Sequence, residues 1–83
     1  MIQYKYEPEK CQSAAYDGED PIGFCAYEPE GNTWKIMTTQ VNPEYGGQGI
    51  ARRLVLQIAE EAQKQGITVI PICSYAVKVL NKN

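Results

Sequence analysis

Hydrophobic and polar residues alternate along the first half of the chain as they do in short strands separated by turns. Four runs are strand candidates: Ile2–Tyr6, a weaker Cys11–Tyr16, Ile22–Tyr27, and Thr33–Val41, which is rich in β-branched and aromatic residues. Turn-forming Asp-Gly, Pro and Gly-Asn residues lie between them. Because hairpin-length connections join antiparallel neighbours, this half predicts a meander of three or four antiparallel strands.

The hydrophobic period changes to that of a helix after Pro43. The apolar stripe of this helix consists of Ala51, Leu54, Val55, Ile58, Ala59 and Ala62. Gly66 stands where a glycine commonly ends a helix. The spacing therefore predicts one long amphipathic helix in the second half.

A further strand and a short helix are expected after Gly66. Ile67–Ile72 is nearly all apolar, which is typical of a strand buried on both faces, although Pro71 needs an unpaired or splayed edge. Ser74 is placed to cap a last helix over Tyr75–Leu80. The fold class predicted is a single α/β domain spanning residues 1–83: a meander, a long helix, a strand and a short helix.

Composition excludes several kinds of chemistry. The chain has no histidine, so His-ligated metals, Ser-His-Asp triads and a His general base are ruled out. Cys11, Cys25 and Cys73 leave one thiol over in any disulfide scheme and form no Cys-x-x-Cys pair, so no metal is expected. No apolar run approaches the ~20 residues of a membrane span, and no secretory signal is recognised. A cytoplasmic protein is predicted.

Charge is unevenly distributed, although the net charge of −2 gives no reason to expect a nucleic-acid or membrane partner. Residues 1–44 hold eight acids and three bases, whereas residues 45–83 hold two acids and five bases. A basic second half suits a small anionic ligand. An accidental asymmetry of solvated side chains is the alternative.

Residues 41–52 carry the most specific signal. They leave a strand, place three glycines within four residues (Gly46, Gly47 and Gly49) and open into the long helix. Glycines let successive N–H groups converge, and a helix N-terminus attracts anions. Arg52 and Arg53 add positive charge in the first turn. A phosphate or pyrophosphate site is predicted, although the spacing fits neither a P-loop nor the dinucleotide fingerprint.

This segment resembles the acyl-coenzyme A loop of the GNAT superfamily of N-acetyltransferases, whose pattern is Arg/Gln-x-x-Gly-x-Gly/Ala. Residues 47–51, Gly-Gln-Gly-Ile-Ala, match, with Gly46 in place of the family's Arg or Gln. Residues 71–75, Pro-Ile-Cys-Ser-Tyr, are similar to a segment of the small single-domain branch. The resemblance covers roughly residues 20–80.

The resemblance implies an acetyl-CoA site. Its cofactor-binding residues would be Val41, Gly46, Gly47, Gln48, Gly49, Ile50, Ala51 and Arg52. Backbone amides from Gly47 to Arg52 are expected to bind the pyrophosphate, and Val41 is expected to pair its backbone with the pantetheine arm as an added strand would. The strand holding Val69 should splay from the strand before the loop, leaving a slot for the thioester.

Cys73 and Tyr75 are the catalytic candidates. Cys73 either accepts the acetyl group as a nucleophile or packs as a small hydrophobic residue, and only a helix N-terminus is available to lower its pKa. Tyr75 either donates a proton to the departing CoA thiolate, as the resemblance implies, or is an amphipathic aromatic residue at a helix start. Cys11 and Cys25 are expected to pack.

The predicted function is transfer of acetyl from acetyl-CoA to an unidentified amine, directly or through Cys73. A non-catalytic CoA-binding or interaction domain is the alternative, and a structural protein without ligand is a third. Two departures from the small relatives matter. Thr38-Thr39 lacks the His that often precedes Thr there, and the chain ends at Asn83, where relatives commonly continue. Substrate-side walls are therefore expected to be incomplete or supplied by a partner, as in a homodimer.

Overall fold

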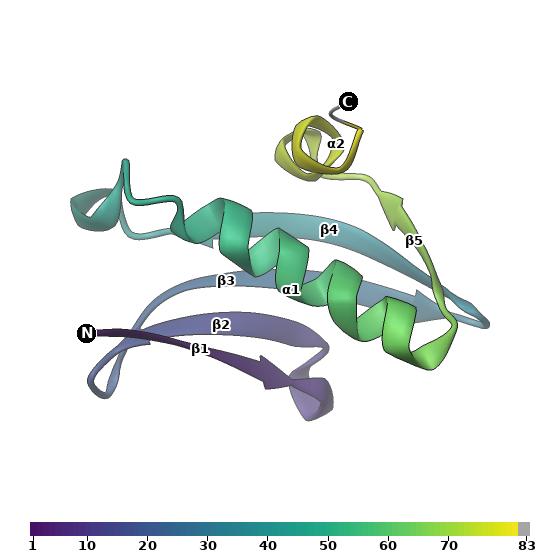
Figure 1. Ribbon diagram of the computed structural model, residues 1–83, viewed down its shortest axis with the longest axis horizontal. Coiled ribbons are helices and arrows are strands. Elements are labelled where there is room, and N and C mark those ends of the chain that lie inside the picture. Colours follow the sequence, from purple (N-terminus) through teal and green to yellow (C-terminus); the bar gives the residue numbers. More distant parts are fainter. Residues whose placement is uncertain (82–83) are drawn as a thin grey trace.

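The computed structural model describes residues 1–81, which form a five-stranded sheet and two α-helices (Figure 1). The elements in chain order are β1 (Ile2–Glu7), the 3₁₀ turn η1 (Pro8–Lys10), β2 (Gln12–Asp17), β3 (Asp20–Glu30), β4 (Thr33–Val41), the 3₁₀ turn η2 (Pro43–Tyr45), α1 (Ile50–Gln65), β5 (Thr68–Pro71) and α2 (Ser74–Leu80). The sheet order is β1-β2-β3-β4-β5; the first four strands are antiparallel, and β5 runs parallel to β4. The predicted α/β fold class is confirmed.

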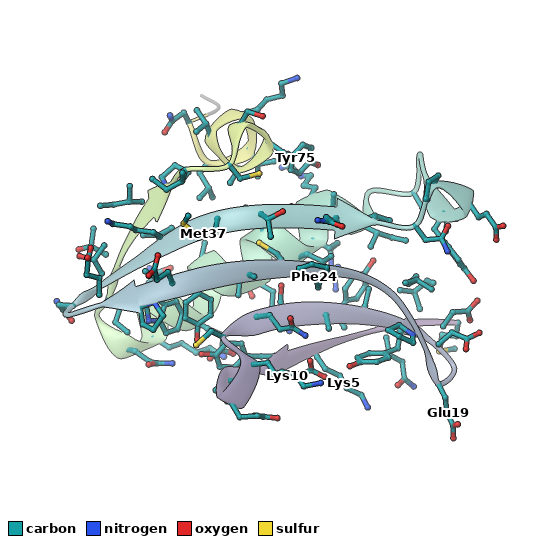
Figure 2. The ribbon with its side chains drawn as sticks, turned by 180° about the vertical axis from the view of Figure 1, so that it is seen from behind. Lys5, Lys10, Glu19, Phe24, Met37 and Tyr75 are labelled. Carbon is teal, nitrogen blue, oxygen red and sulfur yellow. The ribbon has the colours of Figure 1, made fainter. Side chains whose placement is uncertain are left out.

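The molecule has two layers. In Figure 1, α1 crosses one face of the sheet, whereas in the opposite view of Figure 2 the strands lie in front of it. The overall dimensions of 34 × 29 × 17 Å agree, because 17 Å accommodates one sheet and one helix layer. Within residues 1–81, no helix covers the other face of the sheet in these views. Neither helix within residues 1–81 is long and apolar enough to cross a bilayer.

The core lies between α1 and the sheet. Its large buried side chains are Ile22, Cys25, Tyr27, Trp34, Ile36, Ile50, Leu54, Val55 and Ile58. Each of the buried Ile, Leu and Val side chains stabilises the fold by about 1.5–3 kcal/mol through its removal from water. The buried Ser13 hydroxyl donates to the Leu54 carbonyl at 2.8 Å, which joins β2 to α1. Gly66, with φ 70°, ends α1 by donating to the carbonyls of Ala62 and Gln63.

Strand boundaries follow the turn chemistry. β4 has the predicted bounds, while β3 is longer than predicted at both ends because the turns beside it consist of only Gly18-Glu19 and Gly31-Asn32. Gly18 takes a φ of 64°, which a glycine adopts without strain, so strand pairing can resume at Asp20. β2 begins one residue later than predicted because Cys11 sits in a turn at φ 53°.

Two expectations for the C-terminal segment are wrong. β5 is an edge strand, not one buried on both faces, and Ile70 is 40% exposed. The N–H groups of Thr68 and Ile72 point to β4, so by alternation the Pro71 nitrogen faces the open edge, where no ladder bond is lost. Ser74 does not cap α2: it is the first helical residue, Cys73 is the N-cap, and no side chain within residues 1–81 caps it.

Candidate functional site

The strand β4 changes character halfway along its length. Its first half, Thr33–Ile36, pairs with β3 on one side and with β5 on the other. At Ile36 the β5 ladder ends, because the N–H groups of Ile72 and Cys73 both donate to the Ile36 carbonyl at 3.0 Å. Figure 1 shows β5 diverging from β4 toward α2. Within residues 1–81, no strand pairs with residues 37–41 on that side, so they form an open strand edge.

A β-bulge lies where the two strands separate. The β3–β4 register passes from Tyr27↔Ile36 to Ala26↔Thr38, which leaves Met37 as the extra residue. A bulge bends its strand and increases the local twist. β4 therefore turns at the residue after its last bond to β5, and the splay expected between these strands is present.

The glycine loop connects this open edge to α1. Gly47 and Gly49 have φ values of 79° and 75°, a left-handed conformation that costs other residues about 1–2 kcal/mol. A Cβ at either would meet no atom of residues 1–81 within 4 Å, so backbone conformation and not space requires glycine. Gly46 differs: its φ is −65°, and a Cβ there would lie 3.3 Å from the Pro43 carbonyl oxygen. A longer residue at position 46 thus needs only a small adjustment.

Within residues 1–81, the start of α1 presents unpaired backbone donors. Gly49 is the N-cap and has no side chain with which to cap, and the first intrahelical bond runs from the Arg53 N–H to its carbonyl at 3.1 Å. The N–H groups of Ile50, Ala51 and Arg52 therefore have no intrahelical acceptor and lie at the positive end of the helix dipole. Such a terminus binds anions.

The two arginines of the first turn separate. The Arg53 guanidinium lies over the Tyr4 ring, 4.8 Å from its centroid, and so packs against β1. The expectation that Arg53 adds charge at the loop is wrong, because successive helical residues point about 100° apart. Arg52 is exposed at the helix start.

A groove of about 260 Å³ collects most of the predicted site. Its lining residues are Val41, Tyr45, Gly46, Gly47, Gly49, Ile50, Ala51 and Tyr75. Tyr75 comes from α2 (Figure 2), so the groove lined by these residues joins the last residue of β4, the loop, the start of α1 and the start of α2. Gln48, Arg52 and Cys73 are the predicted residues that do not line it.

Tyr45 was missed by sequence reasoning. Its hydroxyl donates to the Asp17 carboxylate at 2.7 Å, which ties the end of η2 to the end of β2. This bond lowers the pKa of Asp17 and raises the pKa of Tyr45. The only signal was an aromatic residue directly before the glycines, and its partner lies far away in the sequence.

Gly23 was also missed. A Cβ at this β3 residue would lie 2.9 Å from the Gln40 carbonyl oxygen and 3.1 Å from Val41 Cγ2, closer than packing allows. Gly23 therefore lets β3 approach the end of β4 and sets the position of Val41. A glycine within a predicted strand is the signal that pointed to such a close approach.

Cys73 lies beside the open edge, beyond the groove. The half-buried thiol is directed at the Thr39 hydroxyl, with Sγ and Oγ1 3.8 Å apart. Burial raises the pKa of Cys73, but the backbone N–H groups of Ala76, Tyr75 and Thr39 and the Thr39 hydroxyl outweigh it, so the pKa is lowered overall. Burial raises the pKa of Cys25, by contrast, to about 11. The start of α2 therefore acts on Cys73 as expected, but the expectation that only a helix N-terminus could lower this pKa is wrong, because Thr39 on β4 lowers it too.

A larger hollow, of about 680 Å³, lies on the opposite face of the sheet from α1. Phe24, Gln12 and Gln40 line it, and they alternate along their strands with residues that face the core. Phe24 is seen on this face in Figure 2. Val41 lines both the hollow and the groove, so both cavities reach the end of β4.

Solved structures of acetyltransferases share this fold. A GCN5-like protein from Staphylococcus aureus superposes with a TM-score of 0.72 at 25% identity, over 95% of this chain and 78% of that one. PaiA N-acetyltransferase from Thermoplasma acidophilum, solved with coenzyme A, gives 0.63 at 25% identity, over 68% of this chain and 35% of its own. N-acetylglutamate synthase from Neisseria gonorrhoeae, solved with coenzyme A and N-acetyl-glutamate, superposes with a TM-score of 0.71 at 17% identity, over 96% of this chain and 21% of that one.

The sequence itself gives the family. No curated protein matches it significantly. The chain spans only about a third of PaiA, so similarity to that enzyme covers a part of it. The profile of the GCN5-related N-acetyl-transferase family matches residues 12–83, which is most of the chain. The protein therefore belongs to the GCN5-related N-acetyltransferase family.

Proposed function

We propose that this protein binds acetyl-CoA between the glycine loop and the open edge of β4, and transfers its acetyl group to an amine. The observation that carries the proposal is the groove, which places unpaired helix N–H groups beside Val41 and Tyr75. In this arrangement the pyrophosphate binds the N–H groups from Gly47 to Arg52. The pantetheine arm bonds to the open backbone of residues 37–41 as an added strand does.

The similar structures support coenzyme A as the ligand. PaiA N-acetyltransferase and the gonococcal N-acetylglutamate synthase were both solved with coenzyme A. The left-handed glycines at 47 and 49 keep bulky side chains away from the helix start, where a diphosphate would have to approach. The larger hollow reaches Val41 from the other face and gives the acceptor amine a separate approach.

In the direct route, the neutral amine attacks the thioester carbonyl carbon. A C–N bond forms, the C–S bond breaks, and CoA leaves as a thiolate that takes a proton from the Tyr75 hydroxyl. The amine nitrogen gives its surplus proton to solvent, which restores the tyrosine through exchange. A backbone N–H at the end of β4 holds the developing oxyanion. Tyr75 suits the role because it lines the groove.

In the covalent route, the Cys73 thiolate attacks first. Thioester exchange gives S-acetyl-Cys73 and free CoA, and the amine then attacks the new thioester and releases the thiol. The lowered pKa of Cys73 favours this route, because the thiolate is the nucleophile. Ping-pong kinetics distinguish it from the direct route.

The test has two stages. Calorimetric titration with CoA and acetyl-CoA is expected to show one site; no binding at millimolar CoA would refute the proposal. A panel of amines is then screened for free CoA and N-acetylated product. Cys73→Ser should abolish turnover but keep CoA affinity under the covalent route, and should keep turnover under the direct route. Cys11→Ser, which removes another partly buried thiol, is the control. Binding without product from any amine would favour the non-catalytic alternative.

A further inference from the structure

We propose that Thr39 is a positioning residue for Cys73, because its hydroxyl holds the thiol at the open edge of β4 and stabilises the thiolate once it forms. This inference rests on the covalent route of the proposed function. It concerns a residue outside the glycine loop and outside the lining of the groove.

The geometry is a chain of three groups from neighbouring elements. The Cys73 thiol, between β5 and α2, donates to Thr39 Oγ1 across 3.8 Å. The Thr39 hydroxyl on β4 donates in turn to Cys25 Sγ on β3 across 3.4 Å. Thr39 belongs to the half of β4 that β5 leaves unpaired, and within residues 1–81 both its hydroxyl and its backbone N–H link Cys73 to that part of the strand.

A hydroxyl has one proton, so it can serve only one sulfur as donor at a time. While Cys73 is a thiol, it is the donor, and the Thr39 proton is directed at Cys25. When Cys73 loses its proton, the Thr39 hydroxyl can rotate and donate to the thiolate, a stronger, charge-assisted bond. Cys25 tolerates this loss, because as a buried thiol with a pKa of about 11 it stays neutral and accepts only a weak bond.

The titratable side chains of the elements around Cys73 do not replace Thr39 in this role. β3 contributes Cys25, which carries no charge at neutral pH, and α2 contributes Tyr75 and the exposed Lys78. β5 has no titratable side chain. The amides of Tyr75, Ala76 and Thr39 itself also favour the thiolate, but they belong to the backbone and persist in any variant of position 39. Removing the hydroxyl therefore isolates its contribution.

The experiment measures the reactivity of Cys73 in the full chain. Wild type, Thr39→Val, Thr39→Ala and Thr39→Ser are alkylated with iodoacetamide across a pH series, and the Cys73 peptide is quantified by mass spectrometry. Val and Ala should raise the thiol pKa and slow alkylation at neutral pH about three- to tenfold, whereas Ser should stay close to wild type. Thr39→Ala is included because it places no extra methyl against the buried Cys25.

Two internal controls separate positioning from damage. Thr38→Val changes the neighbouring side chain, which pairs with Ala26, and should leave Cys73 unaffected. Alkylation of Cys11, in a distant turn, should be the same in every variant. An unchanged Cys73 pH profile in a folded Thr39→Val or Thr39→Ala protein, or an equal shift in Thr38→Val, would overturn the inference.

The readout also separates this inference from the proposed function. CoA titrations of the same proteins measure binding separately, and at saturating acetyl-CoA the S-acetylation of Cys73 should slow by the factor found for alkylation. If wild type binds no CoA, the proposed function fails and the alkylation result still judges the role of Thr39. If CoA binds but the Thr39 variants react normally, only this inference fails.

Discussion

The two halves of β4 differ in what surrounds them. In the first half, strands lie on both sides, Ile36 is 0% exposed, and Trp34 stacks on Tyr27 with ring centroids 4.0 Å apart. In the second half, residues 37–41 keep one strand neighbour and meet the glycine loop. An open strand edge offers N–H and C=O groups that an extended ligand can pair with. The first half therefore stabilises the fold, and the second is free to bind.

The largest difference in unfolding free energy is expected between Ile36→Ala and Met37→Ala. Ile36 is fully buried, so its truncation should cost about 2–5 kcal/mol of unfolding free energy. Met37 is 44% exposed at the bulge, and its truncation should cost about 0.5 kcal/mol or less. Urea unfolding measures both. CoA affinity of folded Ile36→Ala should match wild type; a large loss there would contradict the division of β4.

The next effect separates a binding glycine from a turn glycine. Gly49 and Gly31 have φ values of 75° and 61°, and a Cβ at either meets nothing within 4 Å in residues 1–81. Alanine at either position should cost about 1–2 kcal/mol of stability through the same backbone strain. Only Gly49→Ala should also weaken CoA binding, about tenfold or more, because it disturbs the N-cap of α1. Equal CoA affinities by calorimetry would contradict this account of the loop.

A smaller effect is expected from Tyr45→Phe. The change keeps the ring in the groove but removes the 2.7 Å bond to Asp17, so the loop has more conformations to lose on binding. CoA affinity should fall about three- to tenfold. Tyr16→Phe removes a similar bond, the 2.6 Å hydrogen bond from the Tyr16 hydroxyl to Glu7. Neither residue lines the groove, so CoA affinity should be unchanged. A comparable loss in both variants would show that the tyrosine at 45 has no specific role.

The smallest expected effect is a gain in CoA affinity. Gly46→Arg restores the side chain found at this position in the GNAT pattern, and its φ of −65° is ordinary for any residue. A guanidinium beside the loop should tighten CoA binding about two- to fivefold, with less gain at high salt, because charge-assisted bonds to phosphate are screened. Gly46→Gln, an uncharged matched variant, should gain less. A loss of affinity would mean that Pro43 cannot move to accept the side chain.

Local patterns in the sequence predicted the elements that depend on local chemistry. β4 and the stripe of α1 follow from alternation and helical spacing, and Gly66 ends α1 as its conformational freedom suggests. The apolar run at β5 was misleading, because such a run does not reveal how many neighbours a strand will have; only Pro71 indicated an edge.

Part of the groove could be predicted because it is built from residues that are neighbours along the chain. The glycines and Val41 belong to one continuous segment, so their proximity follows from the chain itself. The bulge at Met37 depends on the register between two strands, and the bonds Tyr45–Asp17 and Thr39–Cys73 join residues far apart in sequence. Such contacts arise from tertiary structure, which no local pattern encodes.

The most direct test of the central claim is a titration of the ¹⁵N-labelled protein with CoA, followed through its backbone amides. Saturable shifts should concentrate at Gly47, Gly49, Ile50, Ala51 and at Val41 on the open edge of β4. Amides in the first half of β4, at Trp34 and Ile36, should move little. Spectra unchanged at millimolar CoA, or shifts confined to other parts of the chain, would contradict the claim that the open half of β4 and the loop form the ligand site.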